Sequence, residues 1–555
     1  MIGLVAVTAA GRASAARLES AWPGRVRRYE GPAKQALPRA WAECDDLVCF
    51  LAVGATVRLI APLLDSKWVD PAVVCVDESA RYAVALVGGH AAGANALARE
   101  VAQVLSAEAV TTTATDAAGV RGLDTLGWPA EGALGPVTRA LLDGEPVAMD
   151  STATWPLPPL PVTTGEARYR IVVTDEARRA DERTVILRPP SLVAGVGASR
   201  GVTADEVLGL LDDVLAEAGL SAKSVTCLAT VDAKAAEPGI VAAAGLRGWP
   251  VVSYPASQLA ALPVPNPSAA ALAAVSTPSV AEAAALAGAD EIVVQKKKSA
   301  RATVAIGRIR PRGRLALIGL GPGARDLLTP RATAELRRAS VIVGLDQYLD
   351  QIRDLVRPGT RVLASGLGAE QTRARDAVAQ ARQGHAVALV GSGDAGVYAM
   401  ASPAIEEAGE DIDVAVVPGV TASLAAAALL GAPLGHDHVV ISLSDLHTPW
   451  DVIERRVQGA ASGDFVVVFY NPRSRGRDWQ LGAALKILAG DRPGNTPAGI
   501  VRNATRPGEV VVLTTLAALD PVQADMLSVV IVGASNTRVV GGRMVTPRGY
   551  RWQEP

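Results

Sequence analysis

Residues 386–423 constrain the fold most strongly, because short apolar runs alternate there with glycine-containing loops. Ala386–Val390 is a continuous apolar run, which is typical of a strand buried on both faces. A loop with three glycines follows at 391–396, then a helical pattern over Met400–Ala408, and then a second apolar run, Val414–Val417, that ends at a Pro-Gly turn. This order predicts a parallel α/β sheet. Both loops are expected at the carboxyl ends of their strands, where such sheets bind ligands.

Proline positions predict where two helices begin. Ser402 and Pro403 fit the N-cap and first residue of the helix after the glycine loop, and Thr329 and Pro330 fit the same positions of an earlier helix. Just before that earlier helix, residues 319–324 have the G-x-G-x-x-A spacing of a dinucleotide fingerprint. A dinucleotide loop opens directly into its helix, whereas this helix signal comes later. We therefore favour a glycine turn against a ligand, and an NAD(P)-dependent oxidoreductase is the alternative.

Strand and helix patterns alternate along the whole chain of 555 residues, which predicts a multidomain α/β protein of roughly three or four domains. The proline-rich segment Pro156–Pro161 and the basic segment Ile309–Arg314 interrupt the alternation. Mostly parallel sheets are expected in the N-terminal modules. The predicted divisions are 1–124, a connecting module at 125–190, 191–307, a linker at 308–313, and 314–555.

Composition excludes several classes of partner. The formal net charge is −2, which gives no bulk attraction to nucleic acid or to a membrane surface. The apolar run 422–434 is too short to span a bilayer, and Gly431 and Pro433 interrupt it. The N-terminus lacks a basic leader and is expected to form a first strand and helix. The four cysteines have no metal-type spacing, which predicts reduced thiols in a cytoplasmic protein without protein-bound metal: Cys44, Cys49, Cys75 and Cys227.

Five motifs follow one another in the C-terminal part: GLGPGARDLLT (319–329), GSGDAGVY (391–398), VVPGVTA (416–422), FYNPRS (469–474) and RNATRPGE (502–509). Together they resemble the tetrapyrrole methyltransferase family. SLSD (442–445) and TPW (448–450), combined with YNPRS, resemble its precorrin-3B C(17)-methyltransferase branch. The resemblance covers 314–555. It implies two α/β subdomains with S-adenosylmethionine in the cleft between them, a tetrapyrrole (precorrin) substrate, and a homodimer formed through this domain.

The resemblance also implies which residues contact the cofactor. Ser392 stands where many relatives have glycine, and Ala395 where many have proline. Asp394 offers an acceptor for a hydroxyl or an amine. Matched motif by motif, the expected contacts to S-adenosylmethionine are Pro322, Ser392, Gly393, Asp394, Val397, Thr421, Ala422, Asn471 and Ala504.

Methyl transfer from a sulfonium to an activated carbon needs mainly positioning. The ring contraction that this branch also performs needs proton movement; Tyr470 is the predicted catalytic residue, with Asp445 and His447 as further candidates by motif proximity. A purely structural role is the competing interpretation for each. Arginines would bind the acetate and propionate groups of a precorrin as bidentate forks, unless they are simply exposed loop residues. Arg473 is the predicted substrate contact, and the other candidates are Arg475, Arg477, Arg502 and Arg506.

A second resemblance covers about residues 1–307. The segments 52–78, 86–100, 111–116, 195–201, 228–239 and 277–286 resemble the cobalt-precorrin-5A hydrolase family. That family opens the lactone left on the macrocycle after ring contraction and releases acetaldehyde. The methyltransferase branch makes such a lactone, so the chain is predicted to be a bifunctional enzyme of corrin-ring (cobalamin) biosynthesis. Whether the substrate carries cobalt stays open, although the hydrolase-like half favours the cobalt branch.

His90 is the predicted catalytic residue of the N-terminal half, because it is the only histidine in the first 300 residues and follows a glycine turn at a strand end. It would act as base toward water or hold a carboxylate, with a backbone-bonded turn histidine as the alternative. Arg200 is predicted to bind a substrate anion from its glycine loop. A non-catalytic module that holds the intermediate is the rival function. Polar residues near other strand ends are Asp77, Glu78, Asn95 and Asp116.

Overall fold

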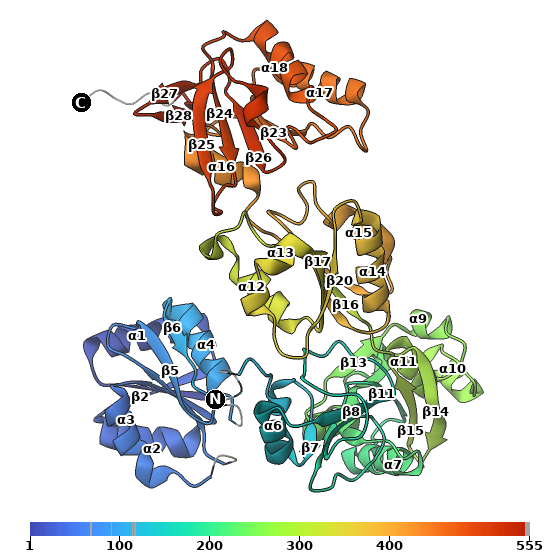
Figure 1. Cartoon of the computed structure of the whole chain (residues 1–555). Helices are drawn as coiled ribbons and strands as arrows, with labels where there is room; N and C mark the ends of the chain where they lie inside the picture. Colours follow the sequence, from blue (N-terminus) through green and yellow to red (C-terminus); the bar gives the residue numbers. More distant parts are fainter. Residues whose placement is uncertain (67–68, 90–91, 114, 116–117, 550–555) are drawn as a thin grey trace. The chain divides into compact units, whose positions relative to one another are not determined.

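The computed structural model describes residues 1–66, 69–89, 92–113, 115 and 118–549 (Figure 1). The chain forms two compact units: Met1–Ala153 with Leu160–Pro311, and Thr154–Pro159 with Arg312–Pro555. Each unit is built from sheets with helices packed on them, which confirms the predicted multidomain α/β class. None of the helices in the described parts of the chain is long and apolar enough to cross a membrane.

The N-terminal sheet has the strand order β2-β1-β3-β4-β5-β6. Helices α1 and α4 cover one face, and α2 and α3 cover the other (Figure 1). Strands β1 to β4 are parallel to one another, as expected. Strand β5 instead runs antiparallel to β4, and β6 is parallel to β5. The bounds are β1 Ile2–Ala6, α1 Ala9–Ala21, β2 Val26–Tyr29, α2 Ala33–Glu43, β3 Asp46–Phe50, α3 Val53–Ile60, β4 Ala72–Val76, β5 Tyr82–Val87, α4 Ala94–Leu105 and β6 Glu108–Val110.

Two further sheets complete the first unit, with strand orders β7-β10-β9-β8 and β13-β12-β11-β15-β14. In the second of these, Gly195 of β11 allows α11 to lie close, because a Cβ atom there would be 1.9 Å from the Ala281 carbonyl oxygen. The bounds are β7 Ala130–Gly132, α6 Leu134–Asp143, β8 Val147–Ser151, β9 Tyr169–Val173, β10 Thr184–Leu187, β11 Leu192–Ala198, α7 Ala204–Glu217, β12 Val225–Val231, α8 Pro238–Arg247, β13 Val251–Tyr254, α9 Ala256–Ala260, α10 Ala269–Val275, α11 Val280–Ala287, β14 Glu291–Lys298 and β15 Ala302–Arg308.

The second unit begins with a fully parallel sheet of order β18-β17-β19-β16-β20, here called the first subdomain (residues 314–421). Helices α14 and α15 cover one face, and α12 and α13 cover the other. The predicted parallel sheet is confirmed. The bounds are β16 Arg314–Gly319, α12 Pro330–Arg338, β17 Val341–Leu345, α13 Asp346–Asp350, β18 Arg361–Ser365, α14 Glu370–Arg382, β19 Ala386–Gly391, α15 Ala401–Ala408 and β20 Asp413–Val417.

One of the two predicted helix starts is correct. The Thr329 hydroxyl accepts the Ala332 N–H at 3.1 Å and caps α12, whose first residue is Pro330. The predicted cap at Ser402 is wrong, because α15 already begins at Ala401 and the Ser402 hydroxyl bonds to Glu406 within the helix. The glycine loop at 319–324 leads into a single 3-10 turn, Arg325–Leu327, and α12 begins only at Pro330. The loop therefore does not open directly into an α-helix, which disfavours the dinucleotide alternative.

The second subdomain (residues 422–545) has a mixed sheet of order β22-β23-β26-β24-β25 and a small sheet of order β21-β28-β27. Helix α16 packs on one face of the larger sheet, and α17 and α18 pack on the other. The bounds are α16 Ala422–Leu430, β21 Gly431–Ala432, β22 His438–Ser442, α17 Trp450–Ser462, β23 Val466–Tyr470, α18 Gln480–Asp491, β24 Pro497–Arg502, β25 Val510–Thr515, β26 Ser528–Val532, β27 Arg538–Val540 and β28 Arg543–Val545.

Candidate functional site

Three glycine-containing loops meet at the carboxyl edge of the first subdomain's sheet, after β16, β19 and β20. Gly321 and Gly393 exchange two backbone hydrogen bonds, of 3.0 and 2.7 Å. A Cβ atom on Gly319 would lie 2.6 Å from the Gly393 carbonyl oxygen, and one on Gly419 would lie 2.2 Å from the same oxygen. The close approach of the loops to one another therefore requires glycine here. The predicted position of both loops at the carboxyl edge is confirmed.

Asp394 connects two of these loops. Its Oδ1 accepts the Gly396 N–H at 2.8 Å, and its Oδ2 accepts the Gly419 N–H at 3.0 Å. Each carboxylate oxygen has a second lone pair, so the side chain keeps the capacity to accept a bond from a ligand hydroxyl or amine. The carboxylate thus fixes the loop geometry and still presents an acceptor at the sheet edge.

The Tyr470 hydroxyl lies at the start of α16. It accepts the Ser423 N–H at 2.7 Å and lies 2.6 Å from the Thr421 hydroxyl oxygen. Because the first N–H groups of a helix have no partner within the helix, this hydroxyl stabilises the N-terminus that carries the predicted contacts Thr421 and Ala422. Asp445 and His447 are exposed, and among the described residues no hydrogen bond joins either of them to Tyr470.

Strained backbone concentrates at the boundary between the two subdomains. Eight described non-glycine residues have positive φ, and four of them lie in the motifs above: Tyr398, Asn471, Asn503 and Thr505. Such conformations cost energy, so they persist where the surrounding structure holds them. Asn471 donates to the Ser442 hydroxyl at 3.0 Å, and the Thr505 hydroxyl accepts the Ala324 N–H at 3.1 Å. The buried Ala504 lies between two of these residues. Sequence motifs marked these loops, but they did not reveal the strain.

Three of the candidate arginines have different bonding partners at this boundary. Arg477 is buried and donates to the Ser444 hydroxyl and the Asn471 carbonyl, so it supports the loop after β23. Arg502 forms an ion pair with Asp525 at 2.7 Å. Arg506 donates to the Pro322 carbonyl and, at 2.6 Å, to the Ser392 hydroxyl. It thereby joins two predicted cofactor contacts of the first subdomain to the second.

A pocket of about 510 Å³ lies at the edge of the second subdomain's larger sheet, between the loop after β23 and the loop before β26. Arg473 and Arg475 line it together with exposed apolar side chains, among them Val522 and Met526. Arg473 uses one N–H group to bond the Val522 carbonyl at 3.2 Å. Asp478 and Asp525 line the pocket as well, and Asp525 is already paired with Arg502, so the walls combine apolar side chains with charges of both signs. The structure places Arg473 in such a pocket, which the motif alone did not show.

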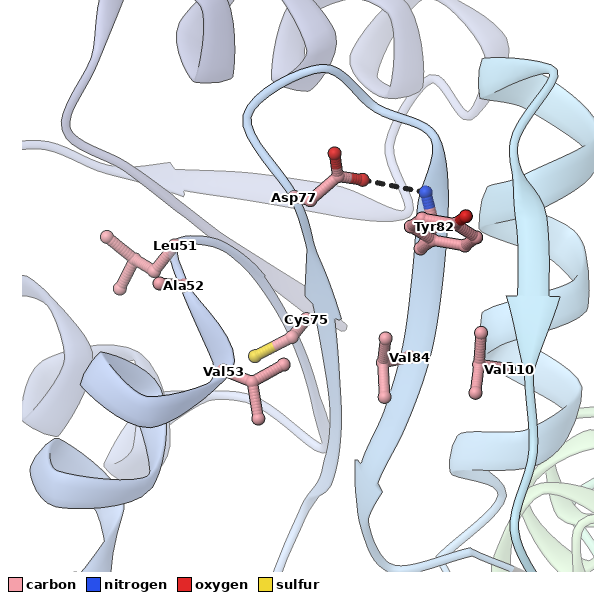
Figure 2. A pocket seen from close by; sticks show the side chains of 8 residues that line it. All are labelled: Leu51, Ala52, Val53, Cys75, Asp77, Tyr82, Val84 and Val110. Atoms are coloured by element: carbon pink, nitrogen blue, oxygen red, sulfur yellow. Dashed lines mark hydrogen bonds between the residues drawn. The ribbon is translucent and has the colours of Figure 1, made fainter.

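The N-terminal domain has an apolar pocket of about 380 Å³ over β4, β5 and β6. Figure 2 shows Cys75, Val84 and Val110 side by side on these three strands, with Asp77 at the rim. Burial alone would raise the pKa of Asp77, but hydrogen bonds from the Tyr82 N–H and from Ser79 outweigh it and hold the pKa below its ordinary value. Burial raises the pKa of the Cys75 thiol, so this cysteine is no ready nucleophile.

The second polar group of this domain lies at the opposite end of the β4–β5 hairpin. Asn95 is buried; its side chain donates to the Thr113 hydroxyl at 3.3 Å, and its N–H donates to the Gly89 carbonyl at 3.0 Å. The hairpin separates this cluster from Asp77 and Glu78 by about 20 Å at the usual rise per residue. The predicted residues His90 and Asp116 lie outside the described residues.

Arg200 is exposed beside a glycine loop whose backbone is already bonded within the chain. The Gly201 N–H donates to Glu237 at 2.7 Å, and the Gly201 carbonyl accepts Arg301 at 3.2 Å. The first of these bonds holds the pKa of Glu237 below its ordinary value. A carboxylate of the chain itself thus occupies the backbone N–H next to Arg200, and the predicted binding of a substrate anion by Arg200 stays a prediction.

Three family profiles match the chain. Residues 314–520 match the family described as tetrapyrrole (corrin/porphyrin) methylases. Residues 192–307 match the cobalamin synthesis G C-terminus, and residues 35–116 match the cobalamin synthesis G N-terminal family. The order of these matches agrees with the fused architecture expected from the motifs.

Similar proteins cover the C-terminal part. The chain is 46% identical over 239 residues to "Probable cobalt-factor III C(17)-methyltransferase" of Salmonella typhimurium, covering 42% of this chain and 99% of that protein. It is 40% identical over 249 residues to the precorrin-3B C(17)-methyltransferase of Sinorhizobium sp, covering 43% and 97%. Among solved structures, the methyltransferase CobJ has 41% sequence identity and a TM-score of 0.40, covering 42% of this chain and 98% of that chain.

Proposed function

Through residues 314–520 the chain belongs to the tetrapyrrole (corrin/porphyrin) methylases, and from this premise we propose that it methylates carbon 17 of a (cobalt-)precorrin-3 macrocycle with ring contraction. The C-terminal part is a methyltransferase of cobalamin biosynthesis, since two relatives so named are matched over almost their whole length. The observation that carries the finer proposal is the meeting of the glycine loops with the RNATRPGE motif through Arg506 and Thr505.

S-adenosylmethionine is the proposed methyl donor. The loops offer what such a cofactor needs: backbone groups that glycine leaves accessible, a carboxylate acceptor at Asp394, and apolar walls from residues such as Val397 and Ala504. No group in this part of the chain has to supply redox chemistry, because the sulfonium itself makes its methyl group electrophilic. The predicted contacts Pro322, Ser392, Gly393, Thr421, Ala422 and Asn471 stay proposals.

Tyr470 is the proposed proton carrier for ring contraction. Its hydroxyl and that of Thr421 are 2.6 Å apart, which is the distance of a short hydrogen bond between hydroxyl groups. A proton can pass along such a pair, and the Ser423 N–H keeps the phenol oriented. Arg473, at the rim of the 510 Å³ pocket, is the proposed contact for a substrate carboxylate.

The test uses the full chain with S-adenosylmethionine carrying an isotopically labelled methyl group and with a precorrin-3 or cobalt-precorrin-3 substrate. Mass spectrometry should find one labelled methyl group in a ring-contracted product. Calorimetry should find binding of S-adenosylhomocysteine to the wild type and none to Gly393→Val. Gly393 has a φ of 68°, a backbone conformation that is unfavourable for a β-branched residue, so valine should distort the loop. Binding of NAD(P) with no binding of S-adenosylhomocysteine would instead support the oxidoreductase alternative.

For the N-terminal part we propose opening of the lactone of cobalt-precorrin-5A. The two cobalamin synthesis G matches support this, together with the contact of two hydrolase-like segments at Asn95 and Thr113 beside Gly89. The full chain should release acetaldehyde from this substrate, and Asn95→Ala and His90→Gln should abolish the release. Asp77→Asn is the matched control, because Asp77 lies at the opposite end of the hairpin. Unchanged turnover in Asn95→Ala and His90→Gln, with weaker retention of the substrate, would instead support a non-catalytic binding module.

A further inference from the structure

Arg506 is held across the boundary between the two subdomains. Its Nε donates to the Pro322 carbonyl, and its Nη2 donates to the Ser392 hydroxyl at 2.6 Å. Its aliphatic stem lies against Gly323, where a Cβ atom would be 2.4 Å from the Arg506 Cγ. The guanidinium therefore has a defined place next to two loops of the proposed cofactor site.

The charge of this guanidinium is not neutralised by the chain. Both of its acceptors are neutral, and within the described parts of the chain no carboxylate lies within ion-pair distance of Arg506. Arg502, four residues earlier, is paired with Asp525 at 2.7 Å. Burial lowers the pKa of Arg506, although an arginine stays protonated at neutral pH. Nη1 has no partner among the described residues, so it is available to a ligand.

A fixed positive charge beside a sulfonium site has a calculable effect. S-adenosylmethionine carries the sulfonium charge, and S-adenosylhomocysteine lacks it. Two like unit charges about 10 Å apart at an effective dielectric constant of about 20 repel each other enough to change an affinity roughly tenfold. A carboxylate placed on the free side of the guanidinium would cancel most of this repulsion.

We propose that Arg506 is a specificity-determining residue, which binds a carboxylate of the acidic macrocycle and thereby makes tight binding of S-adenosylmethionine depend on the substrate. Without substrate, the unpaired guanidinium favours the neutral homocysteine form over the sulfonium. With substrate, the new ion pair removes this preference. The inference rests on the proposed function, because it takes the glycine loops as the cofactor site.

Titration calorimetry on the full chain tests the proposal by the ratio of two dissociation constants, that of S-adenosylmethionine over that of S-adenosylhomocysteine. The ratio should fall roughly tenfold in Arg506→Gln and persist in Arg506→Lys, which keeps the charge. Arg506→Lys thus serves as the matched control, since it changes the hydrogen bonds to Pro322 and Ser392 without removing charge. A variant that only loses packing should bind both ligands more weakly by the same factor, which leaves the ratio of the dissociation constants unchanged.

A second arm uses an octacarboxylate porphyrin as the acidic probe. Added to the wild type, it should tighten binding of S-adenosylmethionine roughly tenfold more than binding of S-adenosylhomocysteine, and this difference should vanish in Arg506→Gln. Equal ratios in the wild type and in Arg506→Gln, or a porphyrin effect equal for both ligands, would overturn the inference. Failure of the wild type to bind either ligand would overturn the proposed function instead, so the two failures are distinguishable.

Discussion

Removal of the Tyr470 hydroxyl gives the sharpest test of how the second subdomain is held together. In Tyr470→Phe the Ser423 N–H, in a residue that is 4% exposed, loses its 2.7 Å bond, and the Thr421 hydroxyl loses its 2.6 Å partner. A buried donor left without a partner costs about 1–3 kcal/mol, and the half-buried Thr421 hydroxyl can turn to water at about 0.5 kcal/mol. We expect the free energy of unfolding to fall by about 2 kcal/mol, which lowers the melting temperature of a unit of this size by about 4–8 °C.

Differential scanning calorimetry of the full chain measures this shift, and amide hydrogen exchange at Ser423 reports the lost bond directly. Thr421→Val is the matched control, because it removes only the hydroxyl-to-hydroxyl bond and should cost less than half as much. A Tyr470→Phe chain that melts within 1 °C of the wild type (about 0.3 kcal/mol by the same conversion), with unchanged exchange at Ser423, would refute the reasoning. If stability falls while S-adenosylhomocysteine binding survives and ring contraction is lost, both roles of Tyr470 are supported.

Three further predictions concern other parts of the chain. Gly419→Ala should cost about 2 kcal/mol of stability, because its Cβ would lie 2.2 Å from the Gly393 carbonyl oxygen; Gly366→Ala, with nothing within 4 Å, is the control in thermal melts. Hydrogen bonds from Asn266 and Lys296 outweigh burial and hold the pKa of Glu282 below its ordinary value. The ionised side chain therefore stabilises the fold at neutral pH, and this stabilisation is lost as pH falls below about 4.5. Unfolding measured against pH should show this loss in the wild type and not in Glu282→Gln. Light scattering should give twice the chain mass, as expected for a homodimer, and a monomer mass would contradict this.

Local patterns were enough to predict the parallel sheet of the first subdomain. Continuous apolar runs such as Ala386–Val390 belong to strands covered on both faces, and in the structure this strand is buried along its whole length. Thr329 and Pro330 gave the start of α12 for the same local reason. The predicted cap at Ser402 is wrong because Ala401 and Ala404 pack into the core, and α15 begins at Ala401, two residues before the predicted first residue, Pro403.

The reversal of strand direction between β4 and β5 was not predicted from the sequence, although the length of the connecting segment indicates it. Only residues 77–81 separate β4 from β5, which is too few for the helical crossover that a parallel pair needs. An antiparallel hairpin follows from that length alone. Its consequence for the candidate hydrolase site is large, since it moves Asp77 to the edge opposite Gly89 and Asn95.

The role of Arg506 was beyond local reasoning, because its two acceptors lie 184 and 114 positions away in the sequence. Motifs placed it among five candidate arginines without separating them. Geometry separates three of them by what each already bonds. Arg502 is paired with Asp525, and Arg477 is buried and bonds Ser444 and the Asn471 carbonyl within the second subdomain. Arg506 instead reaches the first subdomain at Pro322 and Ser392.

The motif residues that look like ligand contacts mostly have partners within the chain. Asp394 bonds two loops, Thr421 bonds Tyr470, Asn471 bonds Ser442, and Thr505 bonds Ala324. These contacts fix the backbone groups that a cofactor would meet, so little ordering remains to be done on binding. Methyl transfer to an activated carbon depends on such positioning more than on acids or bases. The density of internal bonds in these motifs is therefore the physical basis of the proposed activity. Arg506, which has no carboxylate partner among the described residues, is where we propose that the substrate acts on it.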